Sequence, residues 1–182
     1  MFSQIFFSKI KIIYPSLTIF ASILPLYFVA TSSEYRLSRI ETWLSRKCDL
    51  GIDLLGDCFQ LNQSRIAISS GGLFGLGPGT SRARWGSLPN SYSDFISSII
   101  GEEYGFFGLF LLVLAFFILI STTFLIAIRE KNEIKKLISV GFGSWIFFQT
   151  VINLGGAVGI VPITGIVLPF VSYGSSAMIS IF

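Results

Sequence analysis

The sequence has no histidine, only two cysteines and little charge, and each shortage excludes a class of protein. Of its 182 residues, 13% are charged, whereas 52% are hydrophobic and 15% are aromatic, which is too apolar for an ordinary soluble domain. Without histidine a histidine-based catalytic triad is excluded, and two cysteines alone cannot hold a structural zinc ion. We therefore expect the chain to lie in a lipid bilayer.

The surplus of positive charge does not indicate a nucleic-acid partner. The formal net charge is +3, but the Lys and Arg residues are spread over short segments and do not form a basic stripe. In membrane proteins, residues of this kind orient the spans. No internal repeat, low-complexity tract or flexible linker divides the sequence, so we predict one domain over residues 1–182.

Long stretches without charge predict the membrane spans. The stretch 106–128 has 23 residues, which at about 1.5 Å each cover roughly 34 Å and so cross a hydrocarbon core about 30 Å thick. Glycines and prolines between residues 155 and 169 divide the uncharged C-terminal part in two. We predict an all-α integral membrane protein, a polytopic helix bundle with about four transmembrane helices, at 12–30, 106–128, 137–154 and 166–182, and one large extracytoplasmic loop, 31–105.

The distribution of Lys and Arg predicts which side of the membrane each loop faces. The loop 129–136 holds four such residues, and Lys9 and Lys11 precede the first span, so both segments belong on the cytoplasmic side. The segment 31–105 then lies outside the cytoplasm. A cleaved signal peptide is the alternative for the first span, but the further spans favour a retained anchor. Cys48 and Cys58 share the large loop, where a disulfide and two free thiols are both consistent with the sequence.

The part of the loop best suited to chemistry runs from Gly71 to Gly105. It combines a glycine-rich run, a basic pair, a Trp-Gly turn and a lone aspartate directly before the stretch 106–128. Asp94 lies next to Phe95, where water thins out and the proton affinity of a carboxylate can be tuned. The alternative is that Asp94 caps a helix that begins near Phe95, because aspartate is a favoured N-cap residue.

Two arginines and a glycine-rich run precede Asp94. Arg82 and Arg84 are candidates for phosphate binding, since guanidinium groups bind phosphate oxygens in forked pairs; contact with lipid headgroups is the alternative. The run GGLFGLGPG could bring backbone amides to a phosphate, but it lacks the Lys-Ser/Thr ending of a nucleotide-binding loop. We therefore interpret it as a close-packed turn.

Five further polar residues of the loop are candidates for substrate binding. Gln60, Gln63 and Ser64 could hydrogen-bond a sugar or a peptide, or could satisfy the backbone of the folded loop. Glu102 and Glu103 could bind a substrate or a divalent cation, or could complement the N-terminal dipole of the following helix. No set of residues predicts a metal site outright.

The ordered motifs of the chain resemble the SEDS family. Gly71-Gly72-Leu73, Arg84-Trp85-Gly86 and Asp94-Phe95-Ile96 match the large extracytoplasmic loop of that family, and Asn153-Leu154-Gly155 and Ser172-Tyr173-Gly174 resemble its terminal spans. The Arg84-Trp85-Gly86 turn is more like the FtsW division branch than the RodA elongation branch. The match is collinear over almost the whole chain.

The resemblance implies a peptidoglycan glycosyltransferase that polymerises lipid II into glycan strands during cell division. It puts the family's catalytic aspartate on Asp94, which would deprotonate an acceptor sugar hydroxyl as that hydroxyl attacks an anomeric carbon, with Arg84 beside the pyrophosphate. It implies lipid II, a class B penicillin-binding protein and other division proteins as partners, and the bacterial inner membrane at the division septum as the location. It implies no certain cofactor, and a divalent cation is left open.

Two features depart from the family pattern. Family members have many more spans than this chain, which resembles only their C-terminal portion; we therefore expect a fragment, a split product or a mis-started reading frame, and whether it is active alone is left open. Ser175 stands where the family has a second glycine. Two other functions stay open, a flippase of the lipid-linked precursor, which the uncharged stretch 137–182 disfavours, and a non-catalytic membrane scaffold of the division complex.

Overall fold

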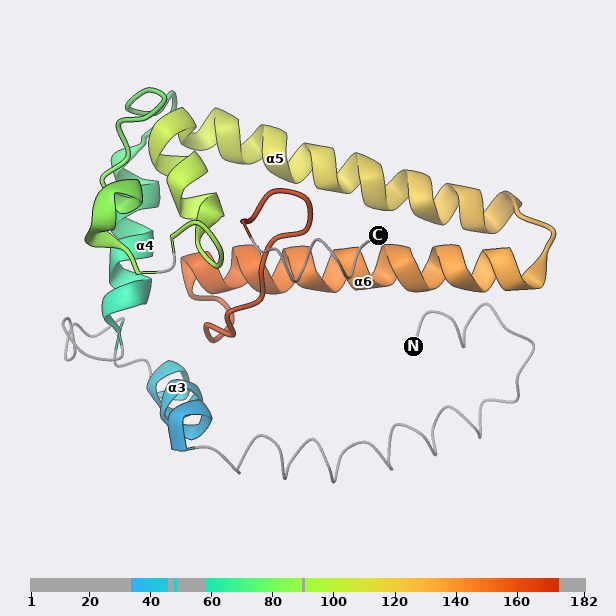
Figure 1. Ribbon diagram of the computed structural model, residues 1–182, viewed down its shortest axis with the longest axis horizontal. Helices are drawn as coiled ribbons and strands as arrows, with labels where there is room; N and C mark the ends of the chain where they lie inside the picture. Colours follow the sequence, from blue (N-terminus) through green and yellow to red (C-terminus); the bar gives the residue numbers. More distant parts are fainter. Residues whose placement is uncertain (1–33, 46–47, 49–57, 90, 174–182) are drawn as a thin grey trace. The chain divides into compact units, whose positions relative to one another are not determined.

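The computed structural model describes residues 34–45, 48, 58–89 and 91–173, and every regular element within this part is helical (Figure 1). In chain order these are α3 (Glu34–Leu44), α4 (Phe59–Ser70), the π-helical turn η1 (Ala83–Ser87), α5 (Ile96–Arg129) and α6 (Glu133–Val158). The prediction of an all-α chain is confirmed for the described residues. The predicted first span, 12–30, lies outside them.

The described residues belong to two compact units. The first comprises residues 34–38 and 117–147, and the second comprises 39–116 and 148–173. In the first unit, Asn132 caps α6, because its Oδ1 accepts hydrogen bonds from the N–H groups of Ile134 at 3.0 Å and Lys135 at 3.4 Å. All the candidate site residues fall in the second unit.

Two of the described helices are long and apolar enough to cross a membrane, α5 with 34 residues and α6 with 26. Large apolar side chains are exposed along α5, among them Phe106, Leu111 and Phe117, as expected for a surface that faces lipid. Helix α5 contains the predicted span 106–128, and α6 contains the predicted span 137–154 but starts earlier because of its cap at Asn132. Their insertion in a bilayer stays a prediction.

The predicted last span does not start at residue 166. Residues 166–173 are not helical, because Gly165 (φ 71°) and Phe170 (φ 61°) both adopt the left-handed backbone region, which a right-handed helix cannot contain. The remainder of that predicted span, 174–182, lies outside the described residues.

The glycine-rich run 71–77 lies along a break in α5. At Gly105 the backbone leaves the helical region, with φ 66° and ψ −158°. Four backbone hydrogen bonds join the two segments, from N–H to carbonyl: Leu76 to Glu102 and Gly77 to Glu103, both at 3.0 Å, Phe106 to Gly72 at 2.9 Å, and Phe107 to Leu73 at 3.2 Å. Backbone groups that the break removes from the helical ladder are thus paired with the run.

Two glycines of the run, Gly71 and Gly75, lie too close to the backbone of α5 for a side chain. A Cβ on Gly71 would overlap the carbonyl oxygen of Gly101, and one on Gly75 would overlap the carbonyl of Glu103. A Cβ on Gly105 of α5 would likewise overlap the backbone nitrogen of Gly75. The interpretation of the run GGLFGLGPG, residues 71–79, as a close-packed turn is therefore confirmed at Gly71 and Gly75, whereas a Cβ on Gly72, Gly77 or Gly79 would meet no close neighbour.

A small apolar core of the second unit includes Phe95, the residue that follows Asp94. Its buried members come from α4, the turn around η1, the start of α5 and the end of α6: Ala67, Ala83, Leu88, Phe95, Ile99 and Ala157. Phe95, the neighbour of Asp94 in sequence, is 2% exposed. Since a fully buried aromatic side chain has little freedom, this core fixes the backbone beside Asp94.

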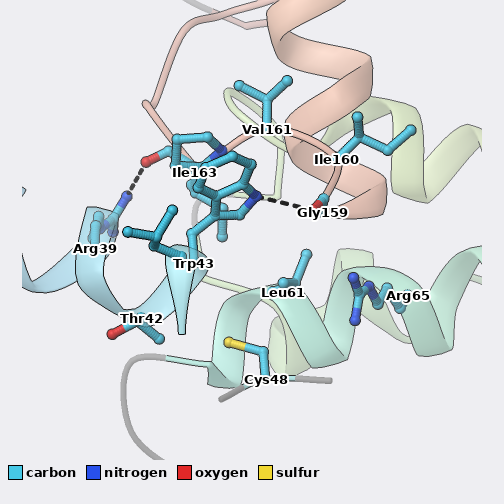
Figure 2. A pocket seen from close by; sticks show the side chains of 12 residues that line it. Arg39, Thr42, Trp43, Cys48, Leu61, Arg65, Gly159, Ile160, Val161 and Ile163 are labelled. Carbon is cyan, nitrogen blue, oxygen red and sulfur yellow. Dashed lines mark hydrogen bonds between the residues drawn. The ribbon is translucent and has the colours of Figure 1, made fainter. Parts of the chain in front are cut away.

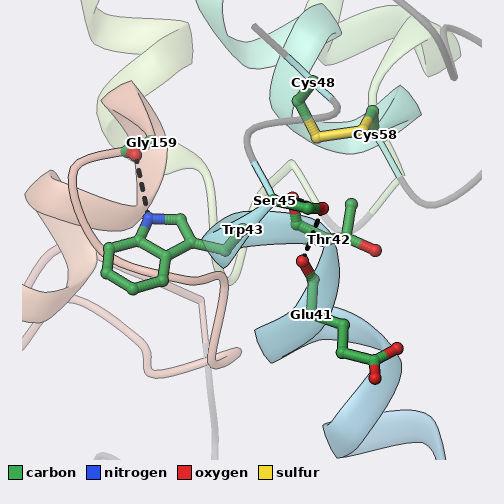
Figure 3. The surroundings of a disulfide bond; sticks show 7 residues. All are labelled: Glu41, Thr42, Trp43, Ser45, Cys48, Cys58 and Gly159. Carbon is green, nitrogen blue, oxygen red and sulfur yellow. Dashed lines mark hydrogen bonds between the residues drawn. A yellow bond between two sulfur atoms is a disulfide. The ribbon is translucent and has the colours of Figure 1, made fainter.

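A disulfide joins Cys48 to Cys58, with Cα atoms 5.2 Å apart (Figure 3). This decides between the two alternatives that the sequence left open. The bond ties the segment after α3 to the residue before α4. Figure 3 also shows Trp43 of α3, whose Nε1–H donates to the carbonyl of Gly159 at 3.2 Å and so attaches α3 to the segment that follows α6.

Candidate functional site

Asp94 lies in the turn immediately before α5. Its side chain is half-buried, and neither carboxylate oxygen forms a hydrogen bond or ion pair with any residue in the described part of the chain. A carboxylate in this position keeps its acceptor capacity for an incoming group. It is the feature of this unit that best suits proton transfer.

The alternative role of Asp94 as a helix cap is not observed. Helix α5 begins at Ile96, and the carbonyl of Phe95 accepts hydrogen bonds from the N–H groups of Ser98 at 2.9 Å and Ile99 at 3.4 Å. Phe95 thus occupies the N-cap position. The carboxylate of Asp94, one residue earlier, bonds none of the first-turn N–H groups.

The segment that follows α6 forms the surface opposite Asp94. A Cβ built on Gly165 would lie 3.5 Å from Oδ2 of Asp94. Asn153 of α6 joins the two sides, because its Nδ2 donates to the backbone carbonyl of Asp94 at 2.9 Å and to that of Ile166 at 2.8 Å. The pocket between them has a volume of about 10 Å³, which is room for about one water molecule.

A larger cavity, of about 590 Å³, lies beside the same segment and does not include Asp94 (Figure 2). It is bounded by α3, α4 and residues 159–163. Arg39 donates from Nη1 to the carbonyl of Ile163 at 3.0 Å, and Arg65 donates from Nε to that of Val158 at 3.0 Å. Both arginines therefore hold the chain around the end of α6, together with Trp43. Ile163 lines both pockets.

Glu102 is placed beneath the turn that carries the two candidate arginines. Its side chain is 2% exposed, and its carboxylate accepts hydrogen bonds from Ser81 Oγ at 2.6 Å and from the backbone N–H groups of Arg82 at 3.0 Å and Ala83 at 3.1 Å. These donors satisfy a buried charge without a cation. Within the described residues, no three Cys, Asp or Glu side chains gather where they could hold a metal ion.

The side chains of Arg82 and Arg84 are exposed at the surface of η1. Nη1 of Arg84 lies 3.8 Å from Oε1 of Glu103, which is buried and has no hydrogen-bond partner in the described part of the chain. At that distance the contact is an ion pair without a hydrogen bond. The guanidinium of Arg84 also lies 5.8 Å from the centre of the Trp85 ring, within range of a weak cation–π contact.

The three polar candidates of α4 have different environments. Ser64 is completely buried; it donates to the carbonyl of Ala157 at 2.6 Å, so the hydroxyl of Ser98, at 2.7 Å, must donate to it. Gln60 accepts a hydrogen bond from Nη2 of Arg39 at 3.1 Å. Gln63 is half-buried. Ser64 and Gln60 therefore both have partners inside the protein, a carbonyl of α6 and a side chain of α3, and neither partner is backbone of the loop itself.

The structure adds residues that were not among the sequence candidates. Asn153 and Gly165 approach Asp94 from a segment about 60 to 70 positions later in the chain. One signal for Asn153 was present, because it is one of two amide side chains, with Gln149, within the uncharged stretch 137–182, where a polar side chain is expensive and needs a partner. Gly165 carried no comparable signal.

The comparisons with known proteins agree on one family. The family described as "Cell cycle protein" (FTSW_RODA_SPOVE) matches residues 1–182. The chain is 47% identical over 121 residues to a protein of Bacillus subtilis named "Probable peptidoglycan glycosyltransferase FtsW", covering 66% of this chain and 30% of that protein. It is 37% identical over 181 residues to a protein of the same name from Buchnera aphidicola subsp. Schizaphis graminum, covering 97% of this chain and 50% of that one.

A solved structure is also similar. It is described as "Structural coordination of polymerization and crosslinking by a peptidoglycan synthase complex", and one of its chains matches 99% of this chain with a TM-score of 0.65 and 25% identity, over 48% of its own length. The chain spans from under a third to half of the length of the curated relatives named above.

Proposed function

This chain belongs to the FtsW, RodA and SpoVE family of cell cycle proteins, and on that premise we propose that it is the catalytic portion of a peptidoglycan glycosyltransferase. The proposed reaction joins lipid II units into glycan strands during cell division. The observation that carries the proposal is Asp94, a half-buried carboxylate without a partner in the described residues, at the start of a long apolar helix.

Asp94 is the general base of the proposed reaction. Its carboxylate takes the proton of an acceptor sugar hydroxyl while the hydroxyl oxygen bonds to the anomeric carbon of the donor sugar. The bond between that carbon and the lipid pyrophosphate breaks at the same time, and the pyrophosphate leaves with the bonding electrons. Proton transfer of this kind typically contributes about 10² to 10⁴ in rate.

The exposed arginines support the departure of the pyrophosphate. Arg84 lies 3.8 Å from Glu103 and 5.8 Å from the centre of the Trp85 ring, and its side chain is exposed, so a phosphate oxygen can approach its guanidinium group. A guanidinium group binds phosphate in a forked geometry and offsets its developing charge. Glu102 helps to position the arginines for phosphate binding, because its carboxylate accepts a hydrogen bond from the backbone N–H of Arg82.

The position of Asp94 suits a substrate held by a lipid tail. The exposed apolar side chains of α5 begin at Phe106, only twelve residues after Asp94, so the carboxylate lies close to where a bilayer would end. A class B penicillin-binding protein and other division proteins are the proposed partners, and the division septum of the bacterial inner membrane is the proposed location. The relationship to a solved peptidoglycan synthase complex supports the partnership.

The substitution Asp94→Asn tests the proposal, since it keeps the shape of the side chain and removes the base. It is made in a chimera in which the 182-residue chain follows the N-terminal half of the Bacillus subtilis relative. Polymerisation of fluorescent lipid II in proteoliposomes is expected to fall by about 10²-fold or more. The matched control is Glu41→Gln, which changes an exposed acid of α3 in the same loop and should leave the rate unchanged.

Wild-type polymerisation by Asp94→Asn would refute the proposal. Headgroup flipping by the wild-type chimera without any polymer would replace it with a transport function. Capture of division proteins by a chimera that never forms polymer would replace it with a scaffold function.

A further inference from the structure

We propose that Asn153 is a positioning residue that holds Asp94 and the segment opposite it at a fixed separation. The inference rests on the proposed function of Asp94 as a base. It starts from one amide group that bonds two separate parts of the chain: Nδ2 of Asn153 lies 2.9 Å from the carbonyl oxygen of Asp94 and 2.8 Å from that of Ile166.

The orientation of the amide follows from its partners. Both partners are carbonyl oxygens, which only accept, so the atom that faces them must be the NH₂ group. The two N–H bonds are thereby both used, and Oδ1 is left buried without a partner in the described part of the chain. Burial of an unpaired oxygen is costly, so an apolar side chain would suit this position better if it served packing alone.

The position of the carboxylate depends on the backbone that Asn153 holds. Because the carboxylate oxygens of Asp94 bond no described residue, the location of the side chain is set by its own backbone. That backbone is fixed on one side by the buried Phe95 and on the other by the amide of Asn153.

The second bond of Asn153 sets the opposite surface. Ile166 directly follows Gly165, whose backbone approaches Oδ2 of Asp94. A further bond joins the same two regions, from the N–H of Tyr173 to the carbonyl of Tyr92 at 3.0 Å. Asn153 is 4% exposed and lies near the end of α6. A buried residue of a helix thus holds both sides of the space in which an acceptor hydroxyl would meet the carboxylate of Asp94.

The rate of the chemical step is more sensitive than substrate binding to the position of Asp94. A displacement of about 1 Å can cost roughly 10²-fold in the chemical step, whereas the lipid tail and the sugars would bind through other residues. Loss of the amide should therefore lower kcat and leave KM nearly unchanged.

The test compares Asn153→Leu, Asn153→Gln and Thr150→Val in the same chimera. Leucine keeps the approximate volume and removes both hydrogen bonds, and glutamine keeps the amide on a longer arm. Thr150→Val is the matched control, because its buried hydroxyl, one turn away, has no partner in the described residues. We expect kcat to fall about 10- to 100-fold in Asn153→Leu, to recover partly in Asn153→Gln and to stay unchanged in Thr150→Val, with KM for lipid II within about twofold throughout.

A double-mutant cycle with Asp94→Glu adds a readout that general destabilisation would not give. If Asn153 acts through Asp94, the two substitutions are not additive in kcat.

Strict additivity overturns the inference, as does wild-type kcat in both Asn153 variants or an equal rise in KM. If Asn153→Leu fails to insert, the cycle is run with Asn153→Gln, and strict additivity of that variant with Asp94→Glu overturns the inference. Polymerisation by Asp94→Asn would remove the proposed function first, whereas a silent Asp94→Asn with active Asn153 variants removes this inference alone.

Discussion

Two contacts of the second unit are built in opposite ways. The glycine-rich run 71–77 meets α5 backbone to backbone, with four hydrogen bonds and no space for a Cβ at Gly71 or Gly75. The last residue of α6 and the segment after it, residues 158–166, are held instead by side chains from three helices, Arg39 and Trp43 of α3, Arg65 of α4 and Asn153 of α6. The first contact has no space for a substituted side chain at these two glycines, whereas the second consists of several separate side-chain hydrogen bonds.

This difference indicates which of the two contacts in the second unit tolerates amino-acid substitutions. A backbone contact either forms or fails, because any side chain at its centre must displace the main chain. A contact made through side chains can lose one support and shift slightly. The candidate base, Asp94, adjoins the adjustable contact, while the turn with Arg82 and Arg84 depends on Glu102 at the rigid one.

The largest effect is expected from Gly75→Ala. The new methyl group would overlap the carbonyl of Glu103, and Gly75 has a left-handed φ of 83°, so strain and overpacking together should cost about 3 kcal/mol or more. The matched control is Gly72→Ala, with a left-handed φ of 56° but nothing within 4 Å of its Cβ, which should cost only about 1–2 kcal/mol. Thermal unfolding midpoints in detergent measure both. Equal midpoints for the two variants would show that the close contact is not what stabilises the run.

An intermediate effect is expected when the disulfide is removed. Cys48→Ser with Cys58→Ser opens a covalent loop with a sequence separation of 10, which should cost about 2–3 kcal/mol. The same midpoint measurement applies, with a reducing agent as the control. Reduction should lower the wild-type midpoint to that of the variant and leave the variant unchanged; a wild-type midpoint insensitive to reduction would contradict this expectation.

The smallest effect is expected from Trp43→Phe. It removes one hydrogen bond to Gly159 and should cost about 0.5–1.5 kcal/mol, because Arg39 and Asn153 still hold the segment. Hydrogen exchange of residues 159–166 should nevertheless speed up. Trp85→Phe is the matched control, since it removes a bond to Gly79 and should leave exchange in 159–166 unaltered. Faster exchange in both variants would mean that the supports are not local.

Sequence reasoning was strongest where the physical signal is local. The absence of charge over 106–128 and 137–154 predicted two helices that the structure contains. The glycines of the run 71–77 predicted a close-packed turn, because glycine is the residue that permits backbone approach. Family membership also followed from the sequence, since its motifs are ordered along the chain, and the family match confirms it.

Sequence reasoning was weakest where the outcome depends on tertiary partners. The uncharged residues from 166 to 173 have the composition of a span, yet their backbone is turned at Gly165 and Phe170 to follow the loop that bears Asp94. Glu102 shows no sign in sequence that its carboxylate is buried under residues 81–83. The distant partner of Asp94, Asn153, is visible in the sequence as a polar side chain in an apolar stretch and as part of a family motif, but neither signal indicates its contact with Asp94.

The covalent bond between Cys48 and Cys58 has a consequence for biosynthesis. Thiols stay reduced in the cytosol and become disulfides in oxidising compartments. On the predicted topology, in which the loop 31–105 lies outside the cytoplasm, a newly made chain would acquire this bond only after the loop had crossed the membrane. The redox state of Cys48 and Cys58 in cells therefore tests the predicted topology, since the disulfide persists only where the loop faces an oxidising compartment.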